Sequence, residues 1–300
     1  MKIFNQPYFA FICSALVLNT TPLLAMEPLR FTQSLDISLA SDSNLSRGDQ
    51  KQNILSDQFV RIDASMSMPV ELAFNKAFFW ELGASHQAYE MIQKLNRSEL
   101  SASLIYRWQH SFSYRAPWYQ LLLNSQWWNV AEDQRDSKLH TLQVMASARL
   151  TTKISWALGW EYQQRDSDAS VFDTEQNRLF LNIDYRLRDG PTFYAGGAYI
   201  DGHSLSTVQS VLCNGQEAIT DYVFTGSSDA IGLDQAFTED YCGVWISFRL
   251  PADTYTSTLG VNYPLNFNSA VDLSWLYVDV SAKGIDYQRQ IIQLNFLKVF

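Results

Sequence analysis

The sequence predicts an all-β protein, a single closed antiparallel transmembrane β-barrel of about twelve strands. Along the last sixteen residues, apolar and polar side chains alternate with a period of two, which is the period of a β-strand. Segments with the same alternation, each long enough to cross a membrane as a tilted strand, recur along the chain. The connections between them are alternately short and long, which is typical of a barrel with turns on one side of a membrane and loops on the other.

The composition agrees with a membrane-spanning sheet and not with membrane helices. The 300-residue chain is 47% hydrophobic, yet after residue 25 no apolar run approaches the roughly 18 residues that a membrane helix needs. A spanning structure would then have to be a closed sheet, because an open sheet edge leaves backbone groups unpaired in lipid. The net charge of −9 argues against nucleic acid as a partner.

The first 25 residues have the pattern of a cleaved secretory signal peptide. Met1-Lys2 is a short positive start, Tyr8 to Leu18 is apolar, and Ala25 is a small residue before the expected cleavage site. The apolar stretch is too short to span a membrane and no stop-transfer charges follow it. We therefore expect an exported protein whose barrel occupies residues 26–300.

The N-terminal half of the predicted barrel contains six strands, over 29–39, 60–68, 78–85, 99–109, 117–130 and 139–151. In the first, Leu35, Ile37 and Leu39 oppose Asp36 and Ser38, so one face is apolar and the other polar. The second, third and fourth repeat this division, with apolar and aromatic residues opposite serines and charged residues.

The C-terminal half contains the other six strands, over 154–163, 178–187, 191–203, 252–266, 269–282 and 285–300. The first of these is the clearest, because Trp156, Leu158 and Trp160 oppose Gly159 and Glu161. The apolar faces are bulky and aromatic, so we expect them to contact lipid, with aromatic residues near the strand ends and the polar faces lining the interior.

The connections support an even number of strands. Short ones are predicted near 69–75, 114–117, 151–153, 188–191 and 266–268, and longer ones near 42–58, 93–98, 131–138, 166–176 and 205–251. Short turns would face the periplasm and long loops the outside. Counting Val244 to Leu250 as a membrane strand would make thirteen, which conflicts with a chain that starts and ends on the periplasmic side. We therefore assign that segment to the loop at about 205–251.

Cys213 and Cys242 lie in this long loop, and both remain after export. A disulfide between them is the simplest expectation, worth roughly 3–4 kcal/mol in the chain-entropy model. Metal ligation lacks partners, because the four histidines, His86, His110, His140 and His203, do not converge in the interior. No metal or cofactor is expected.

The end of the chain resembles the C-terminal strand of bacterial outer-membrane β-barrels, which ends in Phe and is recognised by the barrel assembly machinery. Phe300 fits that pattern, whereas Lys298 departs from it. Segments 199–207, 248–265 and 285–289 look like the end of an uncharacterised, porin-like group of proteobacterial outer-membrane barrel proteins. The resemblance implies fold and location, with lipid and lipopolysaccharide as surroundings, and implies no activity.

The polar faces carry charged side chains of both signs. By parity the interior receives Arg30 and Asp36 together with twelve candidates for lining the lumen and contacting a solute: Arg61, Asp63, Glu81, Glu99, Arg107, Arg149, Glu161, Arg178, Asp184, Arg186, Asp272 and Arg289. One interpretation is a narrow water-filled channel whose charges orient a small polar or ionic solute. The alternative is a closed structural or surface barrel in which the opposite charges pair. Twelve strands lie between a filled barrel and a wide pore, so both remain open.

An enzyme is a third possibility and is not expected. Asp201-Gly-His203 and Asp166-Ser-Asp168 resemble the Asp–His pair and the acidic pair of omptin proteases, but their strands are separated by only one other, so they would lie on the same wall. His203-Ser204 has the wrong spacing for the His and Ser of outer-membrane phospholipase A. No catalytic residue is assigned.

Overall fold

The structure is a computed structural model that describes residues 31–73, 75–111, 113–188, 190–218 and 228–300. Within these residues thirteen strands form one antiparallel sheet. They are β1 (Thr32–Asp42), β2 (Asp57–Ala73), β3 (Lys76–Tyr89), β4 (Arg97–Gln109), β5 (Trp118–Val130), β6 (Ser137–Arg149), β7 (Ile154–Ser167), β8 (Thr174–Arg186), β9 (Thr192–Val211), β10 (Ala230–Leu233), β11 (Val244–Asn266), β12 (Ser269–Ala282) and β13 (Ile285–Val299). The predicted signal peptide and Arg30 lie outside the described residues.

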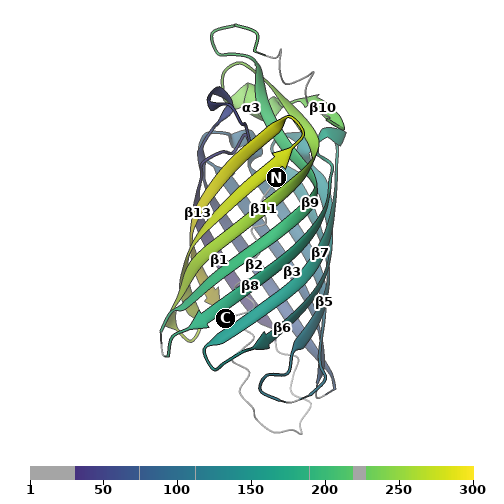
Figure 1. Cartoon of the computed structure of the whole chain (residues 1–300), viewed down its shortest axis with the longest axis vertical. Coiled ribbons are helices and arrows are strands. Elements are labelled where there is room, and N and C mark those ends of the chain that lie inside the picture. The colour runs from purple at the N-terminus through teal and green to yellow at the C-terminus, as the bar shows by residue number, and fades with distance from the viewer. Residues whose placement is uncertain (1–30, 74, 112, 189, 219–227) are drawn as a thin grey trace.

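The sheet closes on itself. Consecutive strands are paired from β1 through β9. Then β9 pairs with β11, and β13 pairs with β1, so twelve strands form the barrel wall and the short β10 lies outside this ring (Figure 1). The predicted twelve-stranded antiparallel barrel is thus confirmed. Ser34 is paired with Val299, so the start of β1 and the end of β13 lie at the same end of the barrel. We call this the turn end, and the opposite end the loop end.

Part of the segment predicted as a loop over 205–251 is strand. β9 continues to Val211 and β11 begins at Val244, and the two remain paired beyond Asp201 and Asp253. Continued pairing satisfies the backbone groups of both strands there, so they need not end at the edge of the apolar belt. Connection lengths also alternate less sharply than predicted. At the turn end, 110–117 is longer than the loop-end connection 131–136.

Four short 3₁₀ turns and one α-helix occupy the loop end of the described chain. The turns are η1 (Lys51–Asn53), η2 (Gln93–Leu95), η3 (Asp133–Arg135) and η4 (Ser170–Phe172), and the helix is α3 (Gln235–Asp240). No helix among the described residues is long and apolar enough to cross a membrane.

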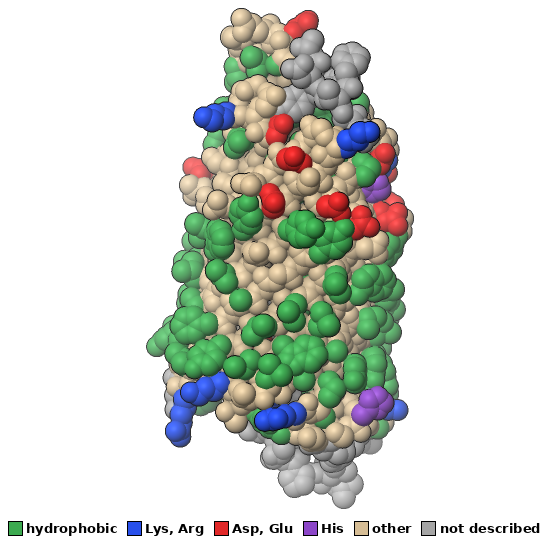
Figure 2. All heavy atoms as spheres, in the orientation of Figure 1, with side chains coloured by type: hydrophobic (Ala, Val, Ile, Leu, Met, Phe, Trp, Pro, Cys, Tyr) green, Lys and Arg blue, Asp and Glu red, His purple; other side chains and the backbone are tan. Residues whose placement is uncertain are grey.

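A belt of exposed apolar side chains surrounds the barrel. Leu100 is 61% exposed, Leu181 45% and Leu259 52%, although a water-soluble protein would bury most such residues. Figure 2 shows the belt on one face, with the acidic side chains above it and basic ones both above and below. At the turn end the ammonium of Lys298 lies 5.8 Å from the centre of the Phe300 ring, which places a charge where the predicted pattern expected an apolar residue. The belt matches the hydrocarbon layer of a membrane.

Leu181→Arg tests this interpretation. Leu181 lies near the middle of β8 on the apolar face, so we expect the change to lower the free energy of unfolding by about 2–4 kcal/mol in lipid vesicles. The matched control is Gln164→Arg, an outward position near the loop end of β7, where about 0–1 kcal/mol is expected. Urea titration followed by tryptophan fluorescence measures both values. Equal costs at the two depths would contradict the membrane assignment.

Candidate functional site

The loop end is closed by a lid. We define the lid as connection 43–56, residues 204–218 and 228–250, which include the ends of β9 and β11 with β10 and α3 (Figure 1). Its apolar core also takes side chains from the β3–β4 connection. The core residues are Leu45, Leu55, Ile92, Leu95, Ala236, Phe237 and Trp245. Because these residues come from separate parts of the ring, their packing joins them across the mouth of the barrel.

Asp234 fastens the lid to the barrel. Its fully buried carboxylate accepts hydrogen bonds from Arg135 Nη2 at 2.5 Å, Ser247 Oγ at 2.6 Å and Thr207 Oγ1 at 3.2 Å. It also caps α3 by accepting from the backbone N–H of Phe237. Arg135 belongs to the β5–β6 connection, so this one carboxylate links the lid to the far wall.

The predicted disulfide between Cys213 and Cys242 is present, with 5.0 Å between the Cα atoms. It joins the two chain segments that leave the loop ends of β9 and β11. Gln209 Nε2 donates to the carbonyl of Cys242 beside it. The disulfide therefore links the two ends of the segment that carries β10 and α3, next to the paired ends of β9 and β11.

In the loop-end half of the barrel, several charged side chains are buried and paired. Glu99 binds Arg61 at 2.8 Å and also Arg97, and Asp63 binds Arg61 at 2.6 Å. In the same half, Arg289 Nε donates to Asp42 Oδ1 at 2.8 Å. Glu161, midway along β7, lies 3.5 Å from Arg178 and also accepts from Gln143 and Gln163. These pairs compensate charge that would otherwise be costly to bury.

In the turn-end half, charged side chains of both signs lie on the wall without contact pairs. Asp36, Glu81 and Asp272 are carried by β1, β3 and β12, whereas Arg107, Arg149 and Arg186 are carried by β4, β6 and β8. Among the described residues none of these six forms an ion pair within 4 Å. Asp184 lies on β8 near Arg186, and Glu81 and Arg107 lie on adjacent strands, so charges of both signs share this part of the interior.

Hydrogen bonds hold several of these turn-end groups in place. Asp272 accepts from Tyr194 OH at 2.9 Å and from Asn295 Nδ2 at 3.2 Å. Arg107 Nε donates to Gln120 Oε1 at 2.7 Å, and its guanidinium lies 5.1 Å from the centre of the Phe79 ring. The charged groups are thus oriented by neutral neighbours, and their charges are not cancelled by a partner at contact distance.

Comparisons with known proteins agree on the fold. The sequence matches no protein-family model, and it matches no curated protein sequence. The structure is similar to the COG4313 outer membrane channel from Pseudomonas putida F1, with a TM-score of 0.56 at 10% identity over 93% of this chain and 100% of that one. The chain has the fold of an outer-membrane β-barrel.

Two further outer-membrane β-barrels show lower similarity. The KdgM porin, solved in complex with disordered oligogalacturonate, has a TM-score of 0.43 at 10% identity, over 89% of this chain and 99% of that one. The NanC porin has a TM-score of 0.44 at 8% identity, over 87% of this chain and 98% of that one.

In this outer-membrane β-barrel, the twelve predicted charged residues occupy the strand face opposite the apolar belt. The structure brings Arg61, Asp63 and Glu99 together and joins Glu161 with Arg178, while Asp184 accepts from Ser155 Oγ at 3.2 Å. Arg149 lies 5.3 Å from the centre of the Tyr114 ring, and Arg186 is exposed at the turn end. Contact of any of them with a solute stays a prediction.

Several important residues were missed by the sequence analysis. Arg97 and Arg165 continue the polar faces of β4 and β7 by one more alternation, so longer predicted strands would have found them. Arg47, Arg135 and Asp234 lie in connections, where no periodicity marks which side chains turn inward. Their positions depend on contacts between distant segments.

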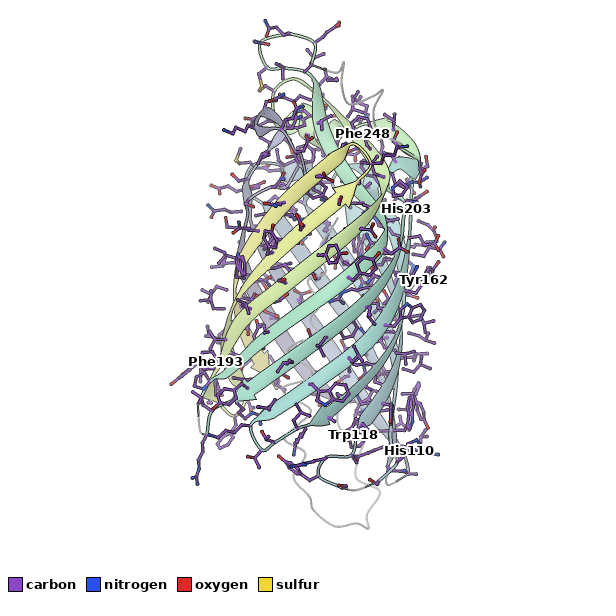
Figure 3. The ribbon with its side chains drawn as sticks, in the orientation of Figure 1. His110, Trp118, Tyr162, Phe193, His203 and Phe248 are labelled. Atoms are coloured by element: carbon purple, nitrogen blue, oxygen red, sulfur yellow. A yellow bond between two sulfur atoms is a disulfide. The ribbon has the colours of Figure 1, made fainter. Side chains whose placement is uncertain are left out.

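The structure gives the rim residue His203 a different acidic neighbour from the one that the sequence comparison considered. His203 Nε2 lies 3.0 Å from Asp229 Oδ2, and its Nδ1 accepts from the backbone of Glu175, while Asp201 is paired in register with Asp253 (Figure 3). Ser204 Oγ is bonded to Tyr287 OH at 2.7 Å. No group of three His, Cys, Asp or Glu among the described residues could hold a metal ion.

Proposed function

We propose that this protein is an outer-membrane channel for small polar or ionic solutes, closed at its loop end by the lid. The observation that carries the proposal is the charge arrangement of the turn-end half, where acidic and basic side chains share the interior without pairing. Carboxylates and guanidinium groups are costly to place inside a protein unless water, a partner or a solute contacts them. A structural barrel needs no such groups, whereas a solute path uses them.

The arrangement also suggests how a solute is selected. The carboxylates of Asp63 and Asp272 act electrostatically on Asp36. Together these groups make the potential negative along the wall from β12 to β2. Arg107 and Arg149 provide positive potential on the β4–β6 side. A polar solute that passes between them would align its dipole across the barrel, and an ion would contact one side.

The proposal fixes the orientation of the chain. The turn end would face the periplasm and the lid the outside, in lipid and lipopolysaccharide, after export by residues 1–25 and insertion by the assembly machinery through the strand that ends at Phe300. The lid would then be the element that controls entry from outside.

A closed structural or surface barrel is the second candidate. It is favoured by the packed lid core and by the paired charges of the loop-end half, including Glu99 and Glu161, which are 7% and 0% exposed. The two functions differ in one measurable property, because a channel conducts ions and a closed barrel does not.

Planar bilayer recording with Arg107→Gln tests the channel. We expect the wild-type protein to conduct. Under a salt gradient, the reversal potential of the variant should be shifted toward cation selectivity relative to the wild type, because the substitution removes a positive charge from the solute path. Glu161→Gln should shift it in the opposite direction and by less, since Glu161 is balanced by Arg178. The control is Arg115→Gln, an exposed residue of the turn-end connection 110–117. Silent bilayers from folded protein would favour the closed barrel.

A further inference from the structure

Beneath the lid, five arginines converge within the barrel. They are Arg47 from connection 43–56, Arg97 from β4, Arg135 from the β5–β6 connection, Arg165 from β7 and Arg289 from β13. Each of the five is at most 7% exposed. Arg97 and Arg165 both lie over the Trp128 ring, 4.5 and 4.9 Å from its centre. Arginines from the lid and from separate strands therefore share one region.

Three of the five have carboxylate partners and two do not. Arg97 binds Glu99, Arg135 binds Asp234, and Arg289 binds Asp42. Arg165 donates to Ser137 Oγ and to the carbonyl of Arg135, both at 3.0 Å and both uncharged acceptors. For Arg47 the described residues provide no acceptor for Nε and no ion pair. Two buried guanidinium groups thus have no carboxylate at contact distance within the described chain, although Asp173 acts on Arg165 from farther away.

The backbone conformation of connection 43–56 turns the Arg47 side chain inward. Its backbone adopts the left-handed conformation, with φ at 61°, which costs energy for a residue other than glycine. Ser206 Oγ donates to its carbonyl at 2.7 Å, and Asn44 Nδ2 ties the same connection to the carbonyls of Gly48 and Gln288. Hydrogen bonds to β9 and β13 therefore hold the connection in a conformation that buries the Arg47 side chain.

Arg47 keeps its charge at neutral pH. Burial, with the neighbouring charges of Arg289 and Arg135, lowers the pKa of its guanidinium to about 9, which is still well above 7. Other groups facing it are Tyr89 and Tyr287, whose neutral hydroxyls supply no negative charge at that pH. The charge is therefore present where no described carboxylate balances it.

We infer that Arg47 and Arg165 form a binding site for a small anion that carries a carboxylate or phosphate group. Guanidinium groups bind such oxyanions through paired, charge-assisted hydrogen bonds, and burial strengthens them. Arg97 and Arg135, which act on Arg165 together with Arg47, add positive potential around the site. The inference deepens the proposed function by naming the class of solute, and it rests on that function only for how the anion arrives.

Binding is tested on the full chain in detergent, so that the result does not depend on conduction. Inorganic phosphate and succinate are titrated at constant ionic strength, with sodium chloride as background, by calorimetry and by the thermal unfolding midpoint. We expect saturable binding of at least one of the two anions and a rise of the midpoint. The anion that binds identifies the preferred group. No binding of either would overturn the inference.

Arg47→Gln and Arg165→Gln should each weaken binding on the order of tenfold or more, because each removes charge-assisted hydrogen bonds. Arg47→Lys keeps the charge and should retain part of the affinity. The control is Arg115→Gln, an exposed arginine of the turn-end connection 110–117, with affinity unchanged. Equal affinity of the wild type and Arg47→Gln, or an equal loss in Arg115→Gln, would overturn the site.

A further readout separates a binding role from a structural one. In chloride alone, Arg47→Gln should melt no lower than the wild type, because it removes a buried charge that neighbouring arginines repel. A merely structural arginine would lower the midpoint when replaced. A lower midpoint together with unchanged anion affinity would assign Arg47 to packing and overturn the inference.

Discussion

Removing the lid segment should open the barrel and raise its single-channel conductance several-fold. Val211 and Val244 are register partners, so residues 212–243 can be replaced by an Asn-Gly turn without moving β9 or β11. The deletion removes Ala236 and Phe237 from the lid core, and with them the packing that crosses the mouth. Arg135→Gln is included, because the loss of Asp234 would otherwise leave a buried guanidinium without its carboxylate.

The matched control changes a turn at the same end of the barrel. Replacing Lys283-Gly284, between β12 and β13, with Asn-Gly alters a loop-end connection that contributes nothing to the lid core, so conductance should stay at the wild-type level. Folding of both variants is checked by the heat-dependent mobility of barrels on gels. A folded deletion variant that remains silent would place the block in the interior and favour the closed structural barrel.

Glu99→Ala should lower the free energy of unfolding by about 3–5 kcal/mol, the cost of breaking a buried ion pair by removing one partner. Glu99 binds both Arg61 and Arg97 and accepts from Ser85 Oγ at 3.0 Å. Without it Arg61 keeps Asp63, but among the described residues Arg97 is left with the face of Trp128 as its remaining contact. Urea titration in lipid vesicles measures the loss.

Two further variants show whether the loss comes from uncompensated charge. Adding Arg97→Met to Glu99→Ala removes the stranded guanidinium and should restore much of the stability. Glu90→Ala removes an exposed carboxylate after β3 and should change the free energy by no more than about 0.5 kcal/mol. If the double variant is as unstable as Glu99→Ala alone, packing and not charge explains the effect.

The two halves of the interior have different physical roles. In the loop-end half, paired charges such as Arg289 with Asp42 give a buried, closed structure beneath the lid. In the turn-end half, Glu81, Asp272 and Arg107 are oriented by neighbours but not neutralised. In the proposed channel, the lid would control access and the turn-end charges would favour particular solutes.

The barrel itself could be predicted because its signal is local. Alternation along 154–163 places Trp156, Leu158 and Trp160 outward whatever the neighbouring strands are, and the structure has them so. The disulfide was predictable for a similar reason, since two cysteines shared one predicted connection. The strand extensions of β9 and β11 were not, because they depend on pairing across the connection that separates them.

The candidate site was predicted only in part. Parity placed Arg61 and Glu99 on the same face, but the ion pair between them joins strands separated by β3, and no periodicity indicates it. Arg47 and Asp234 carry no pattern in sequence, because a connection has no repeating geometry to assign a face.

By itself, the sequence determined that this chain forms a membrane barrel with an apolar outside and a charged inside, because strand period two ties each side chain to one face. Tertiary structure alone decided that the mouth is closed, that half of the interior charges are paired, and that Arg47 is buried beside other arginines. These outcomes arise from contacts between segments far apart in the chain, where energy depends on distance in space and not on spacing in sequence.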